Sequence, residues 1–317
     1  MAHELTGTIH GISSPVFKLM TIFEKNSSEM KKLFFFSLVI FLLALCGCRN
    51  KSGSDDIRVM TFNLRYDNPA DSINAWPNRA DLVCRFIKDE KPDLLGMQEV
   101  LLHQYELLDS ALSDYESAGV GRSDGAKGGE MNPVFFRKEK YDMVRTKTFW
   151  LSETPEVAGS QAWGAGLPRI VTWAELVDKE SHEHLFWFNT HFAHDSDSAR
   201  IMSSILLLNK VDSIASGFPF IITGDFNMLP TSRGYQILTG PAESVPLLMD
   251  SYEISEKRPY GPGYSYNDFS DKEGSGRIDY IFVRDGMKVT DHRTIIKKER
   301  GIFISDHWPV EAIVRAK

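Results

Sequence analysis

Six short polar strings along the chain contain side chains that can activate water and hold a metal cation. Each string ends, follows or precedes an apolar segment, and together they supply carboxylates, amides and histidines. They are Asn63, Gln98-Glu99, Asn189-Thr190-His191, Gly224-Asp225-Phe226-Asn227, Arg277-Ile278-Asp279-Tyr280 and Ser305-Asp306-His307. Because sites in α/β folds collect where strands end at one edge of a sheet, we expect these strings to meet at one place.

Each string taken alone also has a purely structural interpretation. Glu99 could stabilise the start of the helix that follows it. Asp225 and Asn227 could simply form a turn. His191 could be a hydrogen-bonded core histidine, and Asp279 a structural partner. The joint occurrence of all six strings favours a catalytic site over these interpretations.

The apolar segments between the strings predict the elements that position them. Alternating or continuous apolar runs predict strands at 57–62, 94–97, 134–136, 170–177, 185–192, 218–223, 278–283, 287–296 and 308–314. Helical spacing predicts helices at 80–88, 101–112 and 198–214. Strands with helices interspersed indicate sheets covered by helices. Residues 57–317 contain no linker or repeat, so we expect one domain there.

The six strings, in this order, resemble the endonuclease/exonuclease/phosphatase superfamily over 57–314. The resemblance implies an α/β fold of the DNase I type. In this fold two packed mixed sheets are flanked by helices in a four-layered α/β/β/α sandwich, with the site at one end. It also implies hydrolysis of a phosphate ester, which needs an activated water and neutralised phosphoryl oxygens.

The resemblance also assigns roles to individual residues. Asp225, with Asn227 beside it, would orient or deprotonate the attacking water. His307 would pair with Asp279, which fixes its tautomer, and would then act as a donor or as a base. His191 would hydrogen-bond a non-bridging phosphoryl oxygen.

Glu99 offers the hard oxygen ligand that Mg²⁺ prefers, with Mn²⁺ as the alternative ion. Asp306 is a candidate second ligand and Asn63 an adjacent amide ligand. Many nucleases of the superfamily carry an acidic residue two positions after the first Asn, where this chain has Arg65. Since Arg65 cannot bind a cation, we predict a single metal ion.

The string Asn63-Leu64-Arg65-Tyr66 resembles the branch of bacterial metal-dependent hydrolases that is similar to the deadenylase-like nucleases. In that branch an Asp is usual at the position of Ala193. Asp195 or Asp197 could replace it.

Three loops are expected to shape the substrate side: 128–132, 149–155 together with 163–169, and 260–269. From them we predict Arg169 as a phosphate clamp, and Trp150 and Tyr266 as stacking partners. The alternative is that the aromatic residues pack the loops onto the fold. The net charge of −7 disfavours a polyanionic partner, so nucleic acid is a less favoured substrate.

The N-terminal part is predicted to be an export signal. Residues 1–29 do not fit a signal peptide, and we interpret them as a spurious or unstructured extension. Residues 30–47 begin with basic residues and continue as an apolar run too short to span a membrane comfortably, as in a lipoprotein signal peptide. The string Leu45-Cys46-Gly47-Cys48 resembles a bacterial lipobox. This resemblance implies cleavage before Cys48 and lipidation of its thiol, with 48–56 as a tether. The alternatives are a plain membrane anchor or a soluble secreted form.

Taken together, the sequence predicts an exported monomer, anchored to the cell envelope, that hydrolyses small or lipid-borne phosphate esters. The alternatives are an extracytoplasmic nuclease for DNA or RNA and an inactive binding module on the cell surface. Cys84, in a helical pattern, is predicted to be a buried free thiol.

Overall fold

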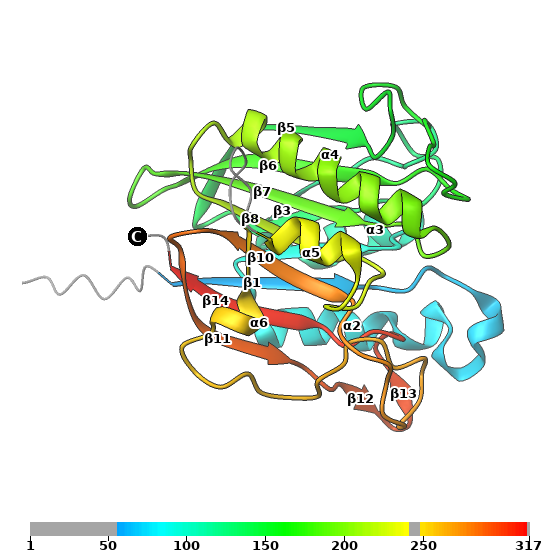
Figure 1. Ribbon diagram of the computed structural model, residues 1–317. Coiled ribbons are helices and arrows are strands. Elements are labelled where there is room, and N and C mark those ends of the chain that lie inside the picture. Colours follow the sequence, from blue (N-terminus) through cyan, green and yellow to red (C-terminus); the bar gives the residue numbers. More distant parts are fainter. Residues whose placement is uncertain (1–55, 241–247, 316–317) are drawn as a thin grey trace, which may run out of the picture. The chain divides into compact units, whose positions relative to one another are not determined.

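Two six-stranded mixed sheets form the centre of the fold in the computed structural model, which describes residues 56–240 and 248–315 (Figure 1). The first sheet has the order β11-β14-β1-β2-β4-β3 and the second the order β5-β6-β7-β8-β10-β9. Strands β1 and β2 are parallel, as are β7 and β8, whereas the other neighbours are antiparallel.

The strand bounds are as follows. The first sheet consists of β1 (Asp56–Asn63), β2 (Leu94–Gln98), β3 (Tyr115–Ala118), β4 (Val134–Arg137), β11 (Lys288–Thr294) and β14 (Val310–Arg315). The second consists of β5 (Tyr141–Trp150), β6 (Ile170–Asp178), β7 (His184–His191), β8 (Phe220–Asp225), β9 (Leu248–Asp250) and β10 (Asp279–Arg284). A small separate pair joins β12 (Lys298–Glu299) to β13 (Ile302–Phe303).

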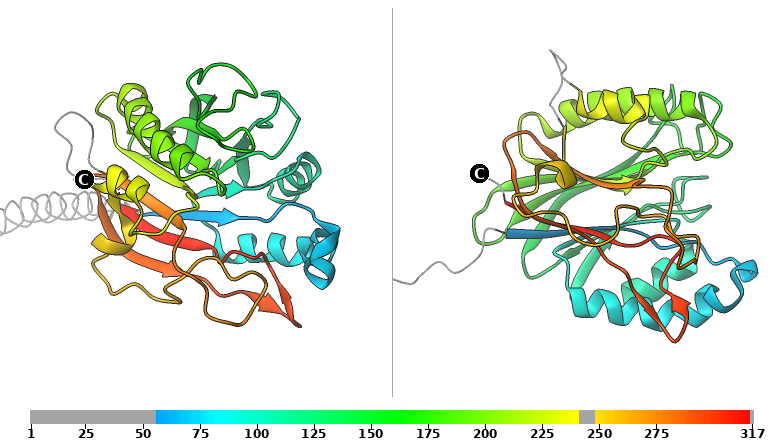
Figure 2. Two further views of the ribbon diagram at one scale, coloured as in Figure 1. Left: turned by 45° about the vertical axis from the view of Figure 1, so that its right-hand side comes forward. Right: turned by 60° about the horizontal axis from the view of Figure 1, so that its bottom comes forward.

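Helices cover the outer faces of both sheets, so the predicted four-layered α/β/β/α sandwich is confirmed (Figure 2). The first sheet is covered by α2 (Trp76–Glu90) and α3 (Leu102–Ala111), preceded by the 3₁₀ helix η1 (Pro69–Asn74). The second is covered by α4 (Asp197–Ala215) and α5 (Arg233–Thr239). A single turn, α6 (Ser251–Ile254), follows β9. No helix in 56–240 or 248–315 is long and apolar enough to span a bilayer.

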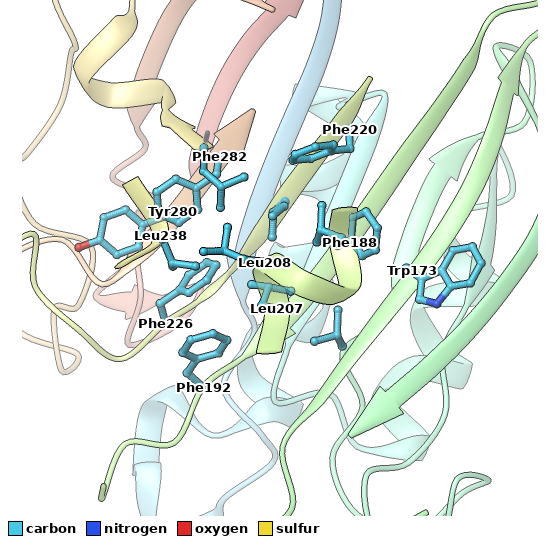
Figure 3. Close-up of a cluster of buried hydrophobic side chains, with 14 of the residues drawn as sticks. Trp173, Phe188, Phe192, Leu207, Leu208, Phe220, Phe226, Leu238, Tyr280 and Phe282 are labelled. Carbon is cyan, nitrogen blue, oxygen red and sulfur yellow. The ribbon is translucent and has the colours of Figure 1, made fainter. Parts of the chain in front are cut away.

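Three clusters of buried apolar side chains hold the two sheets and their covering helices together. One joins the second sheet to α4 and α5 and is rich in aromatic rings, among them Phe188, Phe226 and Tyr280 (Figure 3). A second joins the first sheet to α2 and α3, and it includes Cys84, a buried free thiol as predicted. The third lies between the sheets. Strands with both faces covered read as continuous apolar runs, as Leu185-Phe186-Trp187-Phe188 does in β7.

The strands and helices predicted from the sequence are present, with ends that differ by up to four residues. The short strands β3, β9, β12 and β13, the short helices η1, α5 and α6, and the long strand β5 were not predicted. Phe149 and Trp150 lie at the end of β5 and not in the predicted loop. Strand β5 is the edge of the second sheet and exposes much of its length, so its sequence carries polar residues in place of an apolar pattern.

Arg79 in α2 ties the two chain segments that carry the first and last polar strings. Its side chain is fully buried and donates hydrogen bonds to the carbonyl oxygens of Asn74, Leu64, Arg65 and Ile304 at 2.5 to 3.0 Å. Burial lowers its pKa to about 10, so the guanidinium remains charged at neutral pH. Arg79 therefore fixes the backbone that follows β1 against the backbone that precedes Ser305.

We predict that Arg79→Met destabilises the protein by about 3 kcal/mol or more, because several charged hydrogen bonds inside the core are lost together. Urea unfolding followed by circular dichroism measures this. The control is Arg85→Met on the same helix, whose exposed pairing with Glu299 is worth less than about 1 kcal/mol. Equal losses in the two variants would contradict the role given to Arg79.

Candidate active site

The strand registers bring the predicted strings together. Asn63 is paired with Gln98 across β1 and β2, and Asp225 is paired with both His191 and Asp279 across β7, β8 and β10. Every string except Asn63 contributes a residue to the lining of one pocket of about 490 Å³. Its lining includes Glu99, His191, Asp225, Asn227, Asp306 and His307.

Asn63 links the carboxylates of the two sheets. Its amide nitrogen donates to Glu99 Oε1 at 3.1 Å and to Asp225 Oδ2 at 2.9 Å. Its oxygen accepts a hydrogen bond from the backbone N–H of Arg65 at 3.0 Å. Asn63 is fully buried. This orientation turns its nitrogen, not its oxygen, toward Glu99, so metal ligation by Asn63 stays a prediction and its observed role is to hold two carboxylates together.

His307 and Asp279 form the predicted pair. His307 Nδ1 lies 2.8 Å from Asp279 Oδ2, and because a carboxylate accepts, Nδ1 carries the hydrogen. The other ring nitrogen, Nε2, lies 3.8 Å from Asp225 Oδ2. Burial opposes a charged ring, but the negative charges of Asp279 and Asp225 outweigh it and raise the pKa of His307 well above its usual value. His307 is therefore an imidazolium at neutral pH.

Asp225 lies between two histidines and carries a raised pKa. Burial is the main cause, followed by the charge of Asp279, and together they raise the pKa of Asp225 to about 7. His307 and the N–H of Asn227, which donates to Oδ1 at 2.9 Å, act in the opposite direction. A carboxylate with this pKa can accept or release a proton near neutral pH, as a general base must.

His191 has the opposite protonation state to His307. Its Nε2 lies 3.0 Å from Asn227 Nδ2, an obligatory donor, and 3.5 Å from Asp225 Oδ2. Burial, and next the positive charge of Arg169, lower the pKa of His191 well below its usual value. The ring is therefore neutral, with Nε2 as acceptor and the hydrogen on Nδ1. Two histidines thus flank one carboxylate, one charged and one neutral.

The donor atoms near Glu99 fit a divalent cation. Glu99, His191 and Asp225 each offer an atom within 4.8 Å of the others, and so do Asp225, Asp279 and His307. In the second group the His307–Asp279 hydrogen bond uses the ring, so the first group is the better candidate. Its carboxylate oxygens suit Mg²⁺ or Mn²⁺, whereas the His191 ring has no free lone pair, because Nε2 accepts from Asn227 and Nδ1 carries the hydrogen.

Asp306, predicted as the second metal ligand, lies outside both groups. Its carboxylate faces Arg65 Nη1 at 3.5 Å. Burial raises its pKa to about 6, with Glu99 adding to the rise and His307 opposing it. Arg65 is held by two hydrogen bonds to Asp71 at 2.9 Å. The arginine found where many nucleases have an acidic residue therefore competes for Asp306, which supports a site with one ion.

Of the three predicted substrate contacts, Arg169 and Tyr266 line the pocket and Trp150 does not. Tyr266 packs edge-on against the His307 ring, with centroids 5.0 Å apart. Trp150 is 5% exposed, and its indole nitrogen donates to the carbonyl oxygen of Arg122 at 2.7 Å. The prediction of a stacking role for Trp150 is therefore wrong: it supports the pocket wall from behind.

Arg122, Glu130, Tyr66 and His194 also line the pocket and were not predicted as site residues. Arg122 Nη2 donates to Glu130 Oε1 at 2.7 Å, and burial raises the pKa of Glu130. Both residues lie in the glycine-containing segment between β3 and β4. A single arginine in a polar loop has no sequence pattern that marks it as a site residue. The predicted substrate loop 128–132 was therefore the only prediction that included this part of the pocket.

Comparison with known proteins agrees with this geometry. Residues 60–307 match the sequence profile of the Endonuclease/Exonuclease/phosphatase family. The chain belongs to this family and is a phosphoric ester hydrolase of a class that generally depends on a divalent metal. The resemblance inferred from the six strings is thereby confirmed.

Two solved structures from Bacteroides are similar over the whole domain. An endonuclease/exonuclease/phosphatase from Bacteroides vulgatus is 38% identical, with a TM-score of 0.78 over 83% of this chain and 99% of that chain. A mannosyl-6-phosphatase from Bacteroides thetaiotaomicron is 32% identical, with a TM-score of 0.76 over 82% of this chain and 100% of that chain.

A more distant relative is a probable exoribonuclease. It is a probable CCR4-Not complex 3'-5'-exoribonuclease subunit of Encephalitozoon cuniculi, 23% identical over 293 residues. The match covers 80% of this chain and 59% of that protein.

We predict that Asp279→Asn lowers the pKa of His307, because burial is then opposed only by the charges of Asp225 and Asp306. The pKa of His307, followed by NMR, should fall, and kcat for p-nitrophenyl phosphate should fall by about 100-fold or more. Asp285→Asn, in the exposed turn after β10, is the control and should change neither quantity. An unchanged His307 pKa in Asp279→Asn would refute this explanation of the charged ring.

Proposed function

We propose that this chain is an exported, Mg²⁺-dependent hydrolase of a phosphate ester on a small or lipid-borne substrate. The observation that most directly supports this proposal is the arrangement around Asp225. This residue has a charged histidine on one side, a neutral histidine on the other, and Glu99 nearby. The pocket of about 490 Å³ is of the size that binds small molecules. The mannosyl-6-phosphatase relative supports a small substrate and makes sugar phosphates the first to test.

A divalent cation bound at Glu99 would supply positive charge against the phosphoryl oxygens. Asp225 accepts the proton of the attacking water, since its pKa of about 7 leaves part of it ionised at neutral pH. The N–H of Asn227 holds one oxygen of this carboxylate in place. His307, as an imidazolium, acts as a hydrogen-bond donor to negative charge that builds up on the reacting group. Its protonation favours the donor role over the alternative role of base.

His191 was predicted to donate to a non-bridging oxygen. Its Nε2 accepts from Asn227, so the hydrogen that it can donate is on Nδ1, which has no partner among the described residues. We propose that the neutral ring serves the site through that N–H. The low pKa that burial gives the ring leaves Nε2 free to accept from Asn227.

A nuclease is the second candidate, supported by the exoribonuclease relative. Its substrate would have to approach a chain of net charge −7. The third candidate, an inactive binding module, is disfavoured because Glu99, His191, Asp225 and His307 line one pocket with their hydrogen bonds in place. Assays on p-nitrophenyl phosphate, bis-p-nitrophenyl phosphate, mannose 6-phosphate, sphingomyelin and plasmid DNA separate the three candidates.

We predict that chelation with EDTA abolishes hydrolysis and that Mg²⁺ restores it. His307→Ala should lower kcat by about 1,000-fold or more while circular dichroism and Tm stay close to the unmodified protein, because a positioned acid–base group is lost. His182→Ala, an exposed histidine in the turn between β6 and β7, is the matched control and should retain full activity. Hydrolysis that survives either chelation or His307→Ala would exclude the proposed mechanism.

Export rests on residues 30–47 and Cys48, which lie outside the described residues. We propose cleavage of 30–47 as a lipoprotein signal peptide and attachment of the mature chain through a lipid on Cys48. Expression in a Gram-negative bacterium with a radiolabelled fatty acid should label the unmodified chain and place it in the membrane fraction. Cys48→Ser should lose both the label and the membrane association, whereas Cys46→Ser should retain them. A soluble, unlabelled unmodified chain would contradict the anchor.

A further inference from the structure

Arg169 is the arginine of the pocket that lacks a carboxylate partner. The pocket is lined by Arg65, Arg122 and Arg169. Arg65 is paired with Asp71, and Arg122 with Glu130. Within the described residues, no carboxylate lies within 4.0 Å of Arg169, whose Nη2 hydrogen-bonds only His194 Nδ1 at 2.9 Å.

The remaining nitrogens of Arg169 are buried without partners. The side chain is 4% exposed, and neither Nε nor Nη1 has a hydrogen-bond partner among the described residues. Burial and the charge of Arg122 lower its pKa. A buried guanidinium without a counter-ion is costly, because its lost hydration is not replaced. A pocket that keeps an unpaired guanidinium buried in the ligand-free protein is preorganised to bind an anionic group of the substrate.

The backbone of Arg169 is held rigidly at the start of β6. Its carbonyl oxygen accepts from the N–H of Leu151 at 2.8 Å. The carbonyl oxygen of the next residue, Ile170, accepts from Asn132 and Thr190 at 2.9 and 3.0 Å. A side chain on a fixed strand end can form a preorganised binding group.

The other arginines of the pocket already face carboxylates. Arg65 lies close to Asp71 and Asp306, and Arg122 lies close to Glu130. Arg169 is therefore the pocket arginine whose donors remain open to an anion of the substrate. A phosphate monoester carries a charge of about −1.5 to −2 at pH 7 and three acceptor oxygens, whereas a diester carries one negative charge and a second ester group. The unpaired guanidinium and its fork of N–H donors match the monoester.

We propose that Arg169, oriented by its hydrogen bond to His194, binds the terminal phosphate of the substrate and makes this enzyme a phosphomonoesterase. Because the guanidinium always donates, His194 Nδ1 accepts and its ring hydrogen lies on Nε2, which gives the same wall a further donor. The inference rests on the proposed function and identifies the substrate class of the same site.

The kinetic test compares a monoester with a diester in Arg169→Met. We expect kcat/KM for p-nitrophenyl phosphate to fall by about 100-fold, as the loss of a charged hydrogen-bonding partner implies, and kcat/KM for bis-p-nitrophenyl phosphate to change by less than about threefold. Arg169→Lys should retain an intermediate monoester activity, since it keeps the charge without the fork. Arg300→Met, which removes an exposed arginine outside the pocket, is the control and should leave both rates unchanged. A larger loss on the diester than on the monoester would overturn the proposal.

A binding test separates this inference from the proposed function. Without ligand, Arg169→Met should have a Tm equal to or above that of the unmodified protein, because it removes an unpaired buried charge. Sodium phosphate, compared with sodium chloride of equal ionic strength, should raise the Tm of the unmodified protein and of Arg300→Met, but not that of Arg169→Met. An equal phosphate shift in all three proteins would refute the anion site even if the enzyme is active. If no ester is hydrolysed but the phosphate shift depends on Arg169, the proposed function fails and the anion site stands.

Discussion

The active site depends on one buried amide, Asn63, which joins the two sheets through their carboxylates. It comes from β1 of the first sheet and donates both to Glu99, after β2, and to Asp225, at the end of β8 in the second sheet. Carboxylates repel one another when buried without donors between them. The amide therefore lets Glu99 and Asp225 approach within the distance at which both can serve one cation. A site of this kind requires two packed sheets, because neither sheet alone contains both carboxylates.

Much of this arrangement could be predicted from the sequence, for reasons that differ between regions. The strings at Glu99, His191, Asp225 and His307 end or adjoin strands whose two faces are both covered, so their apolar runs are strong patterns. The parallel register of β7 and β8 then places His191 beside Asp225.

The substrate wall could not be predicted to the same extent. Trp150 ends an exposed edge strand, and its orientation follows from one hydrogen bond to the backbone of Arg122, a residue 28 positions away in sequence. The pairing of Arg122 with Glu130 and the missing partner of Arg169 depend on three-dimensional neighbours that leave no periodic pattern. The sequence predicts Asp306 as an acidic residue of the site. It does not predict that Asp306 faces Arg65 and not the candidate metal position, because this depends on side-chain geometry.

The contrast between the two histidines depends on the charged groups that act on each ring. Both rings are buried, which alone would make both neutral. Asp279 hydrogen-bonds His307 and keeps it protonated, whereas Arg169 and Arg122 act on His191 in the same direction as burial and keep it neutral. Arg169 thus has two effects: it offers donors to an anion, and it adds to the effect of burial that keeps His191 neutral. When an anion neutralises Arg169, its influence on His191 weakens, so anion binding at Arg169 and protonation of His191 are electrostatically coupled.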